Sequence, residues 1–510
     1  MPNLIKKHFR RTAELARALD KNDVADWLLN EGYFPEQYVL PPSFTVRGFK
    51  LNTSPKIKRL ADPPRRNLVT ISYPKTLLTS RIFGIQHPDN YHDLVFYIIQ
   101  AWESIIDHLF HDDLKIFSYS FPIPVDAKFA GELGPLRSGR LIYEWIEMAE
   151  NDMVAEAHKY NHIVRADITN FYNSVYTHSI GWALHGREQS LRDKDYVLTG
   201  TKLDRLIQYA NDGRTNGIPV GSALSDLIAE IVLTSIDIKV SKQLQGFNFI
   251  GSRFKDDYRI LCNSQKDAKT ALKVLSDELI SFNLLINEHK TNVLDLPDGL
   301  YRQHDREYQI FSLKGRETIP FKTFELTLLK ALDIHKNFPG TSVLEKFLSE
   351  LFDFDYELKI RFSNDKNEAR KQISKTFSLL MLMKRESEKI LSHVLAVCQA
   401  ILDLHFSKDL KTELKSLTEL EIKKAAEKKS TFELVWLVFF SKYIGLGISD
   451  FQSLMSDQIK SNQLLQSVVL GKQKYFNDSQ LDLFAIPRSC KKTKLVKTLA
   501  VFDRDKKEET

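Results

Sequence analysis

Three aspartates have the spacing of a metal site that two neighbouring strands could form. Asp167 ends the short apolar run HIVRAD, and Asp256 and Asp257 stand side by side in FIGSRFKDDYRILC. Adjacent carboxylates repel each other, so the pair is stable only when it is solvated or neutralised by cations. Taken separately, Asp167 is typical of a helix cap or turn, and the pair is typical of an acidic turn. Taken together, the three carboxylates indicate a metal-binding site.

Phosphoryl transfer is a reaction that needs such a trio. Of two magnesium ions, one activates the attacking 3′-hydroxyl, and the other holds the triphosphate and stabilises the leaving oxygen. Magnesium prefers hard oxygen ligands and binds through few carboxylates plus phosphates. We therefore predict that Asp167, Asp256 and Asp257 are metal-binding catalytic residues for Mg²⁺, with Mn²⁺ as the alternative ion.

A glycine-rich loop and a lysine could complete the site. Gly217, Pro219 and Gly221 form a tight loop before a predicted amphipathic helix at 222–244. Such a loop lets the backbone approach a nucleotide closely, although an ordinary loop-to-helix junction has the same pattern. We predict nucleotide binding at Gly221. The segment NLLINEHKT places Lys290 near the end of a short strand. There it is either solvated or able to contact the triphosphate and protonate the leaving pyrophosphate.

Local patterns indicate the elements that must position these residues. Residues 160–320 alternate extended and helical segments, with strands predicted in HIVRADITNFY and NFIGSRFKDDYRILC. Residues 1–31 have helical spacing, which stops near Gly32. From about residue 321 leucine-rich periodic segments follow one another, and glycine is absent between 341 and 444. That pattern is typical of stacked antiparallel helices. The predicted fold class is therefore α+β followed by an all-α region.

Composition and charge limit the class of protein. The 510 residues are 43% hydrophobic and 27% charged, which is enough for two to four domains. No apolar run reaches the ~20 residues of a membrane span, and the basic N-terminus lacks the apolar core of a signal peptide. The three cysteines are far apart, which excludes a disulfide framework and zinc spacing. We expect a cytoplasmic protein without membrane contact, and the net charge of +6 permits a nucleic-acid partner.

The order of the segments resembles the palm motifs of reverse transcriptases. The matching segments are the strand that ends at Asp167, then GIPVGSALS, FKDD and LLINEHKT. The resemblance implies that Asp167, Asp256 and Asp257 hold the metals, with Asp257 more supportive than ligating in some states. Tyr172 matches the aromatic residue that lies under the sugar and excludes a 2′-hydroxyl. This match implies deoxynucleoside triphosphates as substrates, with core packing as the alternative role of the ring.

The fingers segment and three departures refine the comparison. YPKTLLTSRIFGIQHP resembles the fingers segment, in which Lys75 and Arg81 are candidates for binding the triphosphate. Phe254 stands where tyrosine is common, and Lys255 stands where a small or hydrophobic residue is common. Val220 replaces the glutamine that helps to arrange the incoming nucleotide and the strand it pairs with. That replacement weakens the prediction of template-directed synthesis.

One subgroup fits further details. NFYNSVYTHSIGWALHG and EGYFPEQYVLPPSF, with the helical C-terminal part, resemble abortive-infection (Abi) reverse transcriptases of bacterial phage defence, in particular the prophage-encoded type. The resemblance implies a reverse-transcriptase-like palm and fingers followed by an all-α HEAT-like domain. It also implies untemplated DNA synthesis, a protein primer that leaves single-stranded DNA covalently attached, and a homo-oligomer. The predicted domains are an N-terminal helical segment at 1–60, fingers and palm at 61–320, the HEAT-like domain at 321–505 and a disordered tail at 506–510.

A protein primer needs an acceptor, normally a tyrosine hydroxyl. Tyr33 and Tyr38 are the priming candidates by position, and His8 and Thr12 are alternatives nearer the start. Two rival functions stay open: a templated reverse transcriptase that copies RNA, and an inactive palm that serves as a nucleic-acid-binding scaffold. The intact aspartate trio argues against the inactive palm.

Basic clusters in the C-terminal part have two interpretations. Runs of charge are usually solvated helix faces. The alternative is a channel wall that contacts the phosphates of a growing strand. The residues concerned are Lys423, Lys424, Lys428, Lys429, Lys491, Lys492, Lys494 and Lys497, with Arg361, Arg370 and Arg385 as equal candidates.

Overall fold

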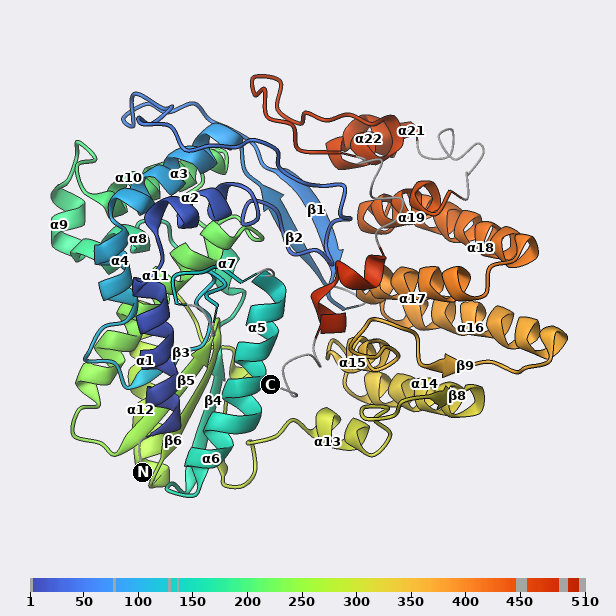
Figure 1. Ribbon diagram of the computed structural model, residues 1–510. Coiled ribbons are helices and arrows are strands. Elements are labelled where there is room, and N and C mark those ends of the chain that lie inside the picture. The colour runs from blue at the N-terminus through green and yellow to red at the C-terminus, as the bar shows by residue number, and fades with distance from the viewer. Residues whose placement is uncertain are drawn as a thin grey trace. The chain divides into compact units, whose positions relative to one another are not determined.

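The chain divides into two compact units whose segments interleave along the sequence (Figure 1). The computed structural model describes residues 3–76, 79–126, 130–134, 137–445, 456–485 and 494–503. The first unit comprises 1–35, 46–68 and 84–301, and the second comprises 36–45, 69–83 and 302–510. The two units therefore differ from the contiguous domains predicted from the sequence, because two short N-terminal segments belong with the C-terminal half.

A five-stranded sheet forms the centre of the first unit, with strand order β3-β5-β6-β4-β7. β3 pairs in parallel with β5, and the other pairs are antiparallel. Successive residues along β4 and β6 are buried, so both sheet faces are covered rather than one face being solvated. The strands are β3 (Ile116–Ser118), β4 (His162–Asp167), β5 (Phe249–Phe254), β6 (Asp257–Cys262) and β7 (Asn292–Asp295).

Helices cover the two faces of this sheet. On one face Arg253 of β5 bonds to acidic residues of α11 (Ala223–Gln243), which in turn packs on α12 (Gln265–Ser281). On the other face the ring of Phe9 in α1 (Leu4–Arg17) lies 5.0 Å from that of Phe117 in β3. The same face carries α5 (Arg137–Ile146), the π-helix η1 (Glu147–Asp152) and α6 (Met153–Ala157). The sheet is thus a fixed platform between two helical layers.

The helix predicted at 222–244 is confirmed in position, but its predicted amphipathic character is wrong. Every residue of α11 from Ala223 to Asp237 is buried. The helix packs against the sheet and also against α4, α8 and α12, so no face of this stretch meets solvent. Ser222 caps its N-terminus by accepting a hydrogen bond from the Ser225 amide at 3.2 Å.

Three other local predictions are corrected. The N-terminal helical region is two helices, because Asp20 caps α2 (Lys21–Leu29) after α1 has ended at Arg17. The strand that carries Asp167 ends there, and the following residues form a short helix, α7 (Phe171–Ser174). Lys290 lies in a 3₁₀-helix, η2 (Glu288–Lys290), ahead of β7 rather than at the end of a strand. Its amide bonds to the Asn287 carbonyl at 3.1 Å, which closes that tight turn.

The remaining helices of the first unit surround the sheet and α11. The buried α3 holds the segment 46–68 through Asp93, whose carboxylate accepts the Lys56 and Ile57 amides at 2.7 Å each. These helices are α3 (Pro88–Gln100), α4 (Trp102–Leu109), α8 (Ser179–His185), α9 (Arg187–Arg192) and α10 (Thr199–Ala210).

The second unit is mainly helical, as the leucine-rich pattern predicts. Residues 36–45 belong to it because Trp436 donates to the Val39 carbonyl at 3.2 Å. The ribbon of β1 (Val69–Pro74) and β2 (Ser80–Ile85) joins it through Tyr73, whose ring lies 5.0 Å from that of Phe432. Its long helices are α14 (Phe321–Asn337), α16 (Lys366–Glu386), α17 (Leu391–Leu404), α18 (Lys408–Glu427) and α19 (Thr431–Tyr443). Its shorter elements are α13 (Gln303–Gln309), α15 (Val343–Ser349), α21 (Ser456–Ser461), α22 (Gln463–Leu470), β8 (Ile319–Pro320) and β9 (Ile360–Arg361). The HEAT-like assignment stays a prediction.

Several of the basic side chains that were candidates for contacting a nucleic-acid strand form ion pairs with acidic residues of the chain. Burial opposes ionisation of Glu421, but hydrogen bonds from Arg385, Lys384 and Lys424 lower its pKa to about 2. Lys384 also pairs with the buried Glu433. Further pairs are Arg370 with Asp409, Lys428 with Glu388 and Lys494 with Glu357. Lys423, Lys429 and Arg361 are exposed, and Lys491 and Lys492 lie outside the described residues.

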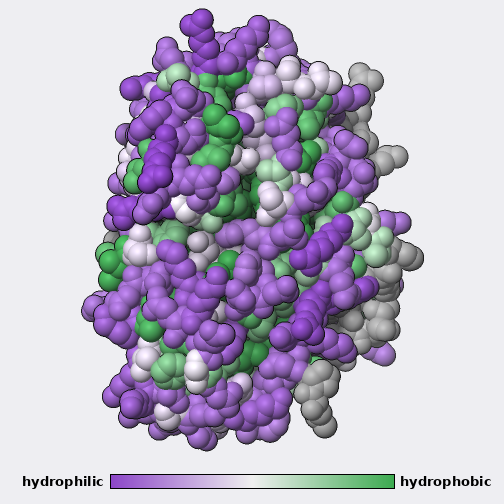
Figure 2. Space-filling model, turned by 90° about the vertical axis from the view of Figure 1, so that its left-hand side faces the viewer, coloured by the Kyte–Doolittle hydropathy of each residue, from purple (hydrophilic) through white to green (hydrophobic). Residues whose placement is uncertain are grey.

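Figure 2 shows one face on which hydrophilic residues predominate and apolar residues are visible between them. Among the described residues, no helix has the length and apolar character of a transmembrane span.

Candidate active site

The sheet brings Asp167 and Asp257 together. They are directly opposite each other at the end of the antiparallel β4–β6 pair. Opposed residues of neighbouring strands point to the same face, with Cβ atoms about 4.5–5.5 Å apart. Asp256 precedes Asp257 in the hairpin turn, and its carbonyl accepts the Ile168 amide at 3.2 Å. The backbone therefore joins the three predicted acids at one corner of the sheet.

The hairpin turn that presents the acid pair has only two residues, Lys255 and Asp256. Phe254 and Asp257 flank it as the last cross-strand pair. Lys255 has φ of +51°, the left-handed conformation that two-residue hairpins require and that non-glycine residues rarely adopt. Its amide donates to the Ser120 hydroxyl at 2.5 Å, and its carbonyl accepts from Arg253 at 3.1 Å. These two bonds hold the strained turn in place.

A buried ion network lies beneath the turn. Arg253 is 0% exposed and donates through Nε to Asp237 at 2.8 Å. Its two terminal nitrogens donate to Glu230 at 2.8 and 3.0 Å, and Glu230 also accepts from the Ser118 hydroxyl at 2.7 Å. Burial raises the pKa of Asp237 to about 6, and the Arg253 charge opposes this rise. The guanidinium thus pairs with two buried acids and holds the turn backbone.

Asp226 links the turn to the predicted sugar-contacting residue. It lies on the same face of α11 as Glu230 and Asp237, within about 40° around the axis. Lys255 approaches its carboxylate at 3.4 Å, and the Tyr172 hydroxyl donates to it at 2.5 Å. Tyr172 is half-buried, whereas the neighbouring Phe171 is buried. A chain of polar contacts therefore connects the catalytic turn to the Tyr172 ring.

The glycine-rich loop lies against the backbone of α7. The Ile218 amide donates to the Tyr172 carbonyl at 2.9 Å. Gly217 has φ of +87°, and a Cβ there would lie 3.3 Å from the Asn173 carbonyl, so a larger residue would push the loop away. Gly221 also has a positive φ, and Val220 beside it is buried. The loop therefore fixes the position of the Tyr172 backbone.

Lys290 contacts Asp167 although it lies in a 3₁₀-helix and not in the predicted strand. Its Nζ lies 3.1 Å from Oδ2 of Asp167, with the lysine side chain 55% and the aspartate 22% exposed. The Asn287 amide also donates to the Asp167 carbonyl at 2.7 Å, which ties η2 to the end of β4. A cation on a flexible stem is thus available at the acidic corner.

The donor set at this corner suits a divalent metal that shares its coordination with phosphates. No group of three or more His, Cys, Asp or Glu side chains within the described ranges forms a preformed metal cage. Magnesium needs none, because it retains waters and binds through one or two carboxylates together with substrate phosphates. Asp167 and Asp257, opposed at the end of β4 and β6, supply such a pair.

The other predicted residues belong to other elements of the chain. Lys75 and Arg81 belong to the β1–β2 segment of the second unit. Tyr33 is 2% exposed, and its hydroxyl donates to the Gln86 carbonyl at 2.5 Å, so its use as an acceptor requires this packing to open. Tyr38 is half-buried, with its ring 5.4 Å from that of Tyr73.

Sequence reasoning missed the charged residues that support the site. Asp226, Glu230 and Asp237 interrupt an apolar helix on one face, and Arg253 interrupts an apolar strand. Four charges at those positions were the available signal, because buried charges must find partners. By contrast, the YTHSI segment has a packing role. Its His178 pairs with Asp204, which raises the pKa of His178.

Comparison with known families decides the class of this domain. Residues 128–309, which include the three aspartates and Lys290, match the family model described as reverse transcriptase (RNA-dependent DNA polymerase). The chain contains a reverse transcriptase domain. A search of curated proteins found no match to the chain.

Solved structures similar to the chain include yeast telomerases. Apo telomerase from Candida tropicalis is 14% identical with a TM-score of 0.30, and the match covers 82% of this chain and 70% of that one. Telomerase from Candida albicans, in complex with a fragment of telomeric RNA, is 12% identical with a TM-score of 0.28, covering 79% and 64%. The chain thus spans less than two thirds of the second structure.

Replacement of Arg253 should strongly lower the stability of the reverse transcriptase domain. Arg253→Met leaves two buried carboxylates unpaired, so we expect the free energy of unfolding to fall by about 3–5 kcal/mol. Urea unfolding of the full chain measures it. The matched control R253M/E230L/D237L removes all three charges and should recover most of the loss, since apolar replacement of a buried triad is often neutral. A loss below about 1 kcal/mol in R253M would contradict this account.

Proposed function

We propose that the chain is a DNA polymerase that adds deoxynucleotides without a template, starting from a hydroxyl of the protein itself. The reverse transcriptase domain makes polymerisation, a nucleotidyl transfer, the coarse activity. The observation that carries the proposal is the pairing of Asp167 with Asp257 across β4 and β6, with Asp256 in the adjoining turn. This corner presents carboxylates on a rigid element, as a metal-dependent transfer requires.

The proposed mechanism assigns a separate role to each side chain. Asp167, Asp256 and Asp257 would hold Mg²⁺ or Mn²⁺, which when bound activates the attacking hydroxyl and stabilises the leaving oxygen. Lys290, within 3.1 Å of Asp167, orients that carboxylate and can donate a proton to the departing pyrophosphate. Lys75 and Arg81 are proposed to bind the triphosphate.

Tyr172 supports the choice of deoxynucleotides. Its hydroxyl is tied to Asp226, and its carbonyl is tied to the glycine-rich loop, so the ring is held from both ends. A fixed aromatic face beneath a sugar leaves no room for a 2′-hydroxyl. Gly221, at the end of that loop, lets the backbone approach the nucleotide.

Specific residues support synthesis that needs no template and starts from a protein primer. Val220 is a buried apolar residue where the family places a glutamine, so this position offers no amide to the paired strand. Tyr33 and Tyr38 remain the priming candidates, with attack through Tyr33 dependent on release from Gln86. The Abi-like segments support a cytoplasmic role in phage defence, as a homo-oligomer carrying single-stranded DNA.

Divalent metal and the acid pair should both be indispensable for incorporation. We expect labelled deoxynucleotide incorporation by the full chain with Mg²⁺ or Mn²⁺ and none with a chelator. D256N/D257N should lose activity by at least about 10³-fold, because charge stabilisation of the transition state is lost. The variant D277N, an acid-to-amide change at an exposed position of α12, serves as control and should retain activity. Full activity of D256N/D257N would exclude these two aspartates as catalytic residues, and a wild-type chain without incorporation would leave only a scaffold function.

The product should be attached to the protein and independent of template. After reaction, a denaturing gel should show a protein band of reduced mobility that nuclease restores. Adding an RNA oligonucleotide of defined sequence should leave the product sequence unchanged, and Y33F or Y38F should abolish the shifted band. A product that tracks the RNA instead identifies a templated reverse transcriptase, and a band that survives both Tyr→Phe changes excludes these two acceptors.

Substitution of Tyr172 separates its ring from its hydroxyl. Y172A should raise ribonucleotide incorporation relative to deoxynucleotide incorporation by roughly 10- to 200-fold, the range for one lost pocket contact. Y172F keeps the ring and should retain discrimination to within a few fold. Competition between labelled dNTP and NTP measures the ratio. Equal discrimination in Y172A and wild type would assign the ring to core packing.

A further inference from the structure

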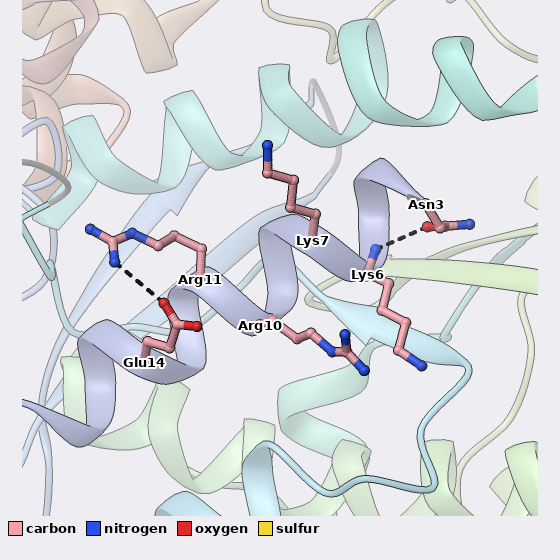
Figure 3. A pocket seen from close by; sticks show the side chains of 6 residues that line it. All are labelled: Asn3, Lys6, Lys7, Arg10, Arg11 and Glu14. Carbon is pink, nitrogen blue, oxygen red and sulfur yellow. Dashed lines mark hydrogen bonds and ion pairs between the residues drawn. The ribbon is translucent and has the colours of Figure 1, made fainter. Parts of the chain in front are cut away.

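The exposed side of α1 carries four cations in two rows. Lys6 and Arg10 extend to one side of the helix, and Lys7 and Arg11 extend to the other (Figure 3). All four are exposed and line one open pocket, and we call them the cationic face of α1. Arg11 pairs with Glu14 at 3.3 Å, but both side chains are solvated, so this acid neutralises little of the face.

Helix stability does not account for the cationic face. Lys6 and Arg10, like Lys7 and Arg11, are like charges four residues apart, a spacing that destabilises a helix. The first turn contains no acidic residue, and cations there oppose the helix dipole. The arrangement therefore costs helix stability and calls for another role.

The opposite side of α1 is fixed to the domain. Ile5, Phe9 and Leu15 are buried, and the Phe9 ring lies 5.0 Å from Phe117 of β3. The Leu4 amide donates to Glu156 of α6 at 2.9 Å, which anchors the helix start. An interfacial membrane helix needs a free apolar side, which α1 lacks. The cationic face is thus held outward on a rigid support.

Two contacts connect α1 to the catalytic turn. The His8 ring stacks on Tyr119, with centroids 4.5 Å apart. Tyr119 follows β3, and its neighbour Ser120 accepts the Lys255 amide at 2.5 Å. The helix that bears the cationic face therefore supports the turn that bears Asp256.

We propose that the cationic face of α1 binds the phosphodiester backbone of a nucleic-acid strand. The polymerase domain on which it lies handles such strands. Lys6 and Arg10 are about 6 Å apart along the helix axis. That spacing lets the two cations of each row contact neighbouring phosphates of one strand. The binding is independent of base sequence.

Salt-dependent binding tests this proposal without requiring catalysis. The full chain is titrated with a fluorescent 20-nucleotide oligo-dT in chelator, over a range of salt concentrations. In K6Q/K7Q/R10Q, loss of three phosphate contacts should reduce the log–log salt slope by about 2 and the affinity on the order of 100-fold at 0.1 M salt. The matched control K266Q/K269Q/K273Q removes three charges from the exposed side of α12 and should keep the wild-type slope and affinity.

The outcomes separate the alternatives. Wild-type binding by K6Q/K7Q/R10Q, or equal losses in both triple variants, overturns the proposal, the second because it shows an effect of net charge alone. Loss of binding to anionic phosphatidylserine vesicles with unchanged oligo-dT binding assigns the face to a lipid surface and also overturns it. If the triple variant unfolds, R10Q alone should lower the slope by about 0.7. Because no nucleotide is present, failure here leaves the proposed polymerase activity unaffected.

Discussion

The corner of the sheet that carries the three aspartates depends on Arg253, which pairs with two buried carboxylates of α11 and holds the carbonyl of a strained turn. A buried ion group is a poor source of stability, because desolvation offsets most of the attraction. Here the ion group instead fixes the position of β5 relative to α11. Hydrophobic contacts tolerate sliding, whereas a planar guanidinium with three fixed partners allows one register of β5 on α11. That register decides where Asp256 and Asp257 stand relative to Asp167.

Asp226 extends this control to Tyr172. It binds both Lys255 of the turn and the Tyr172 hydroxyl, so a single carboxylate sets the spacing between the aspartate corner and the Tyr172 ring. The lysine at 255, unusual among the reverse transcriptases that the sequence resembles, has a partner on α11. Phe254, the neighbouring departure, packs edge-on to Trp145 at 5.3 Å. Both departures are therefore accommodated by contacts within the domain.

The sequence predicted the strands, the long central helix and the corner that joins Asp167 to the acid pair, because these depend on local hydrophobic patterns. It failed where long-range contacts override local pattern. Buried α11 looked amphipathic because its acids, which meet Arg253, resembled a solvated face. Lys290 looked like a strand residue because a 3₁₀ turn has no periodicity to detect. The grouping of residues 36–45 with α19 depends on Trp436, 397 positions away, and no local signal reports it.

That last contact has a consequence for biosynthesis. Val39 leaves the ribosome long before Trp436, and at about 5–20 residues per second the interval is roughly 20–80 seconds. During that time residues 36–45 and the ribbon at 69–83 have no complete partner. The helical unit is therefore assembled late from both ends of the nascent chain. A chain cut short before α19 would leave an early segment exposed, and this makes full-length synthesis a condition for a finished fold.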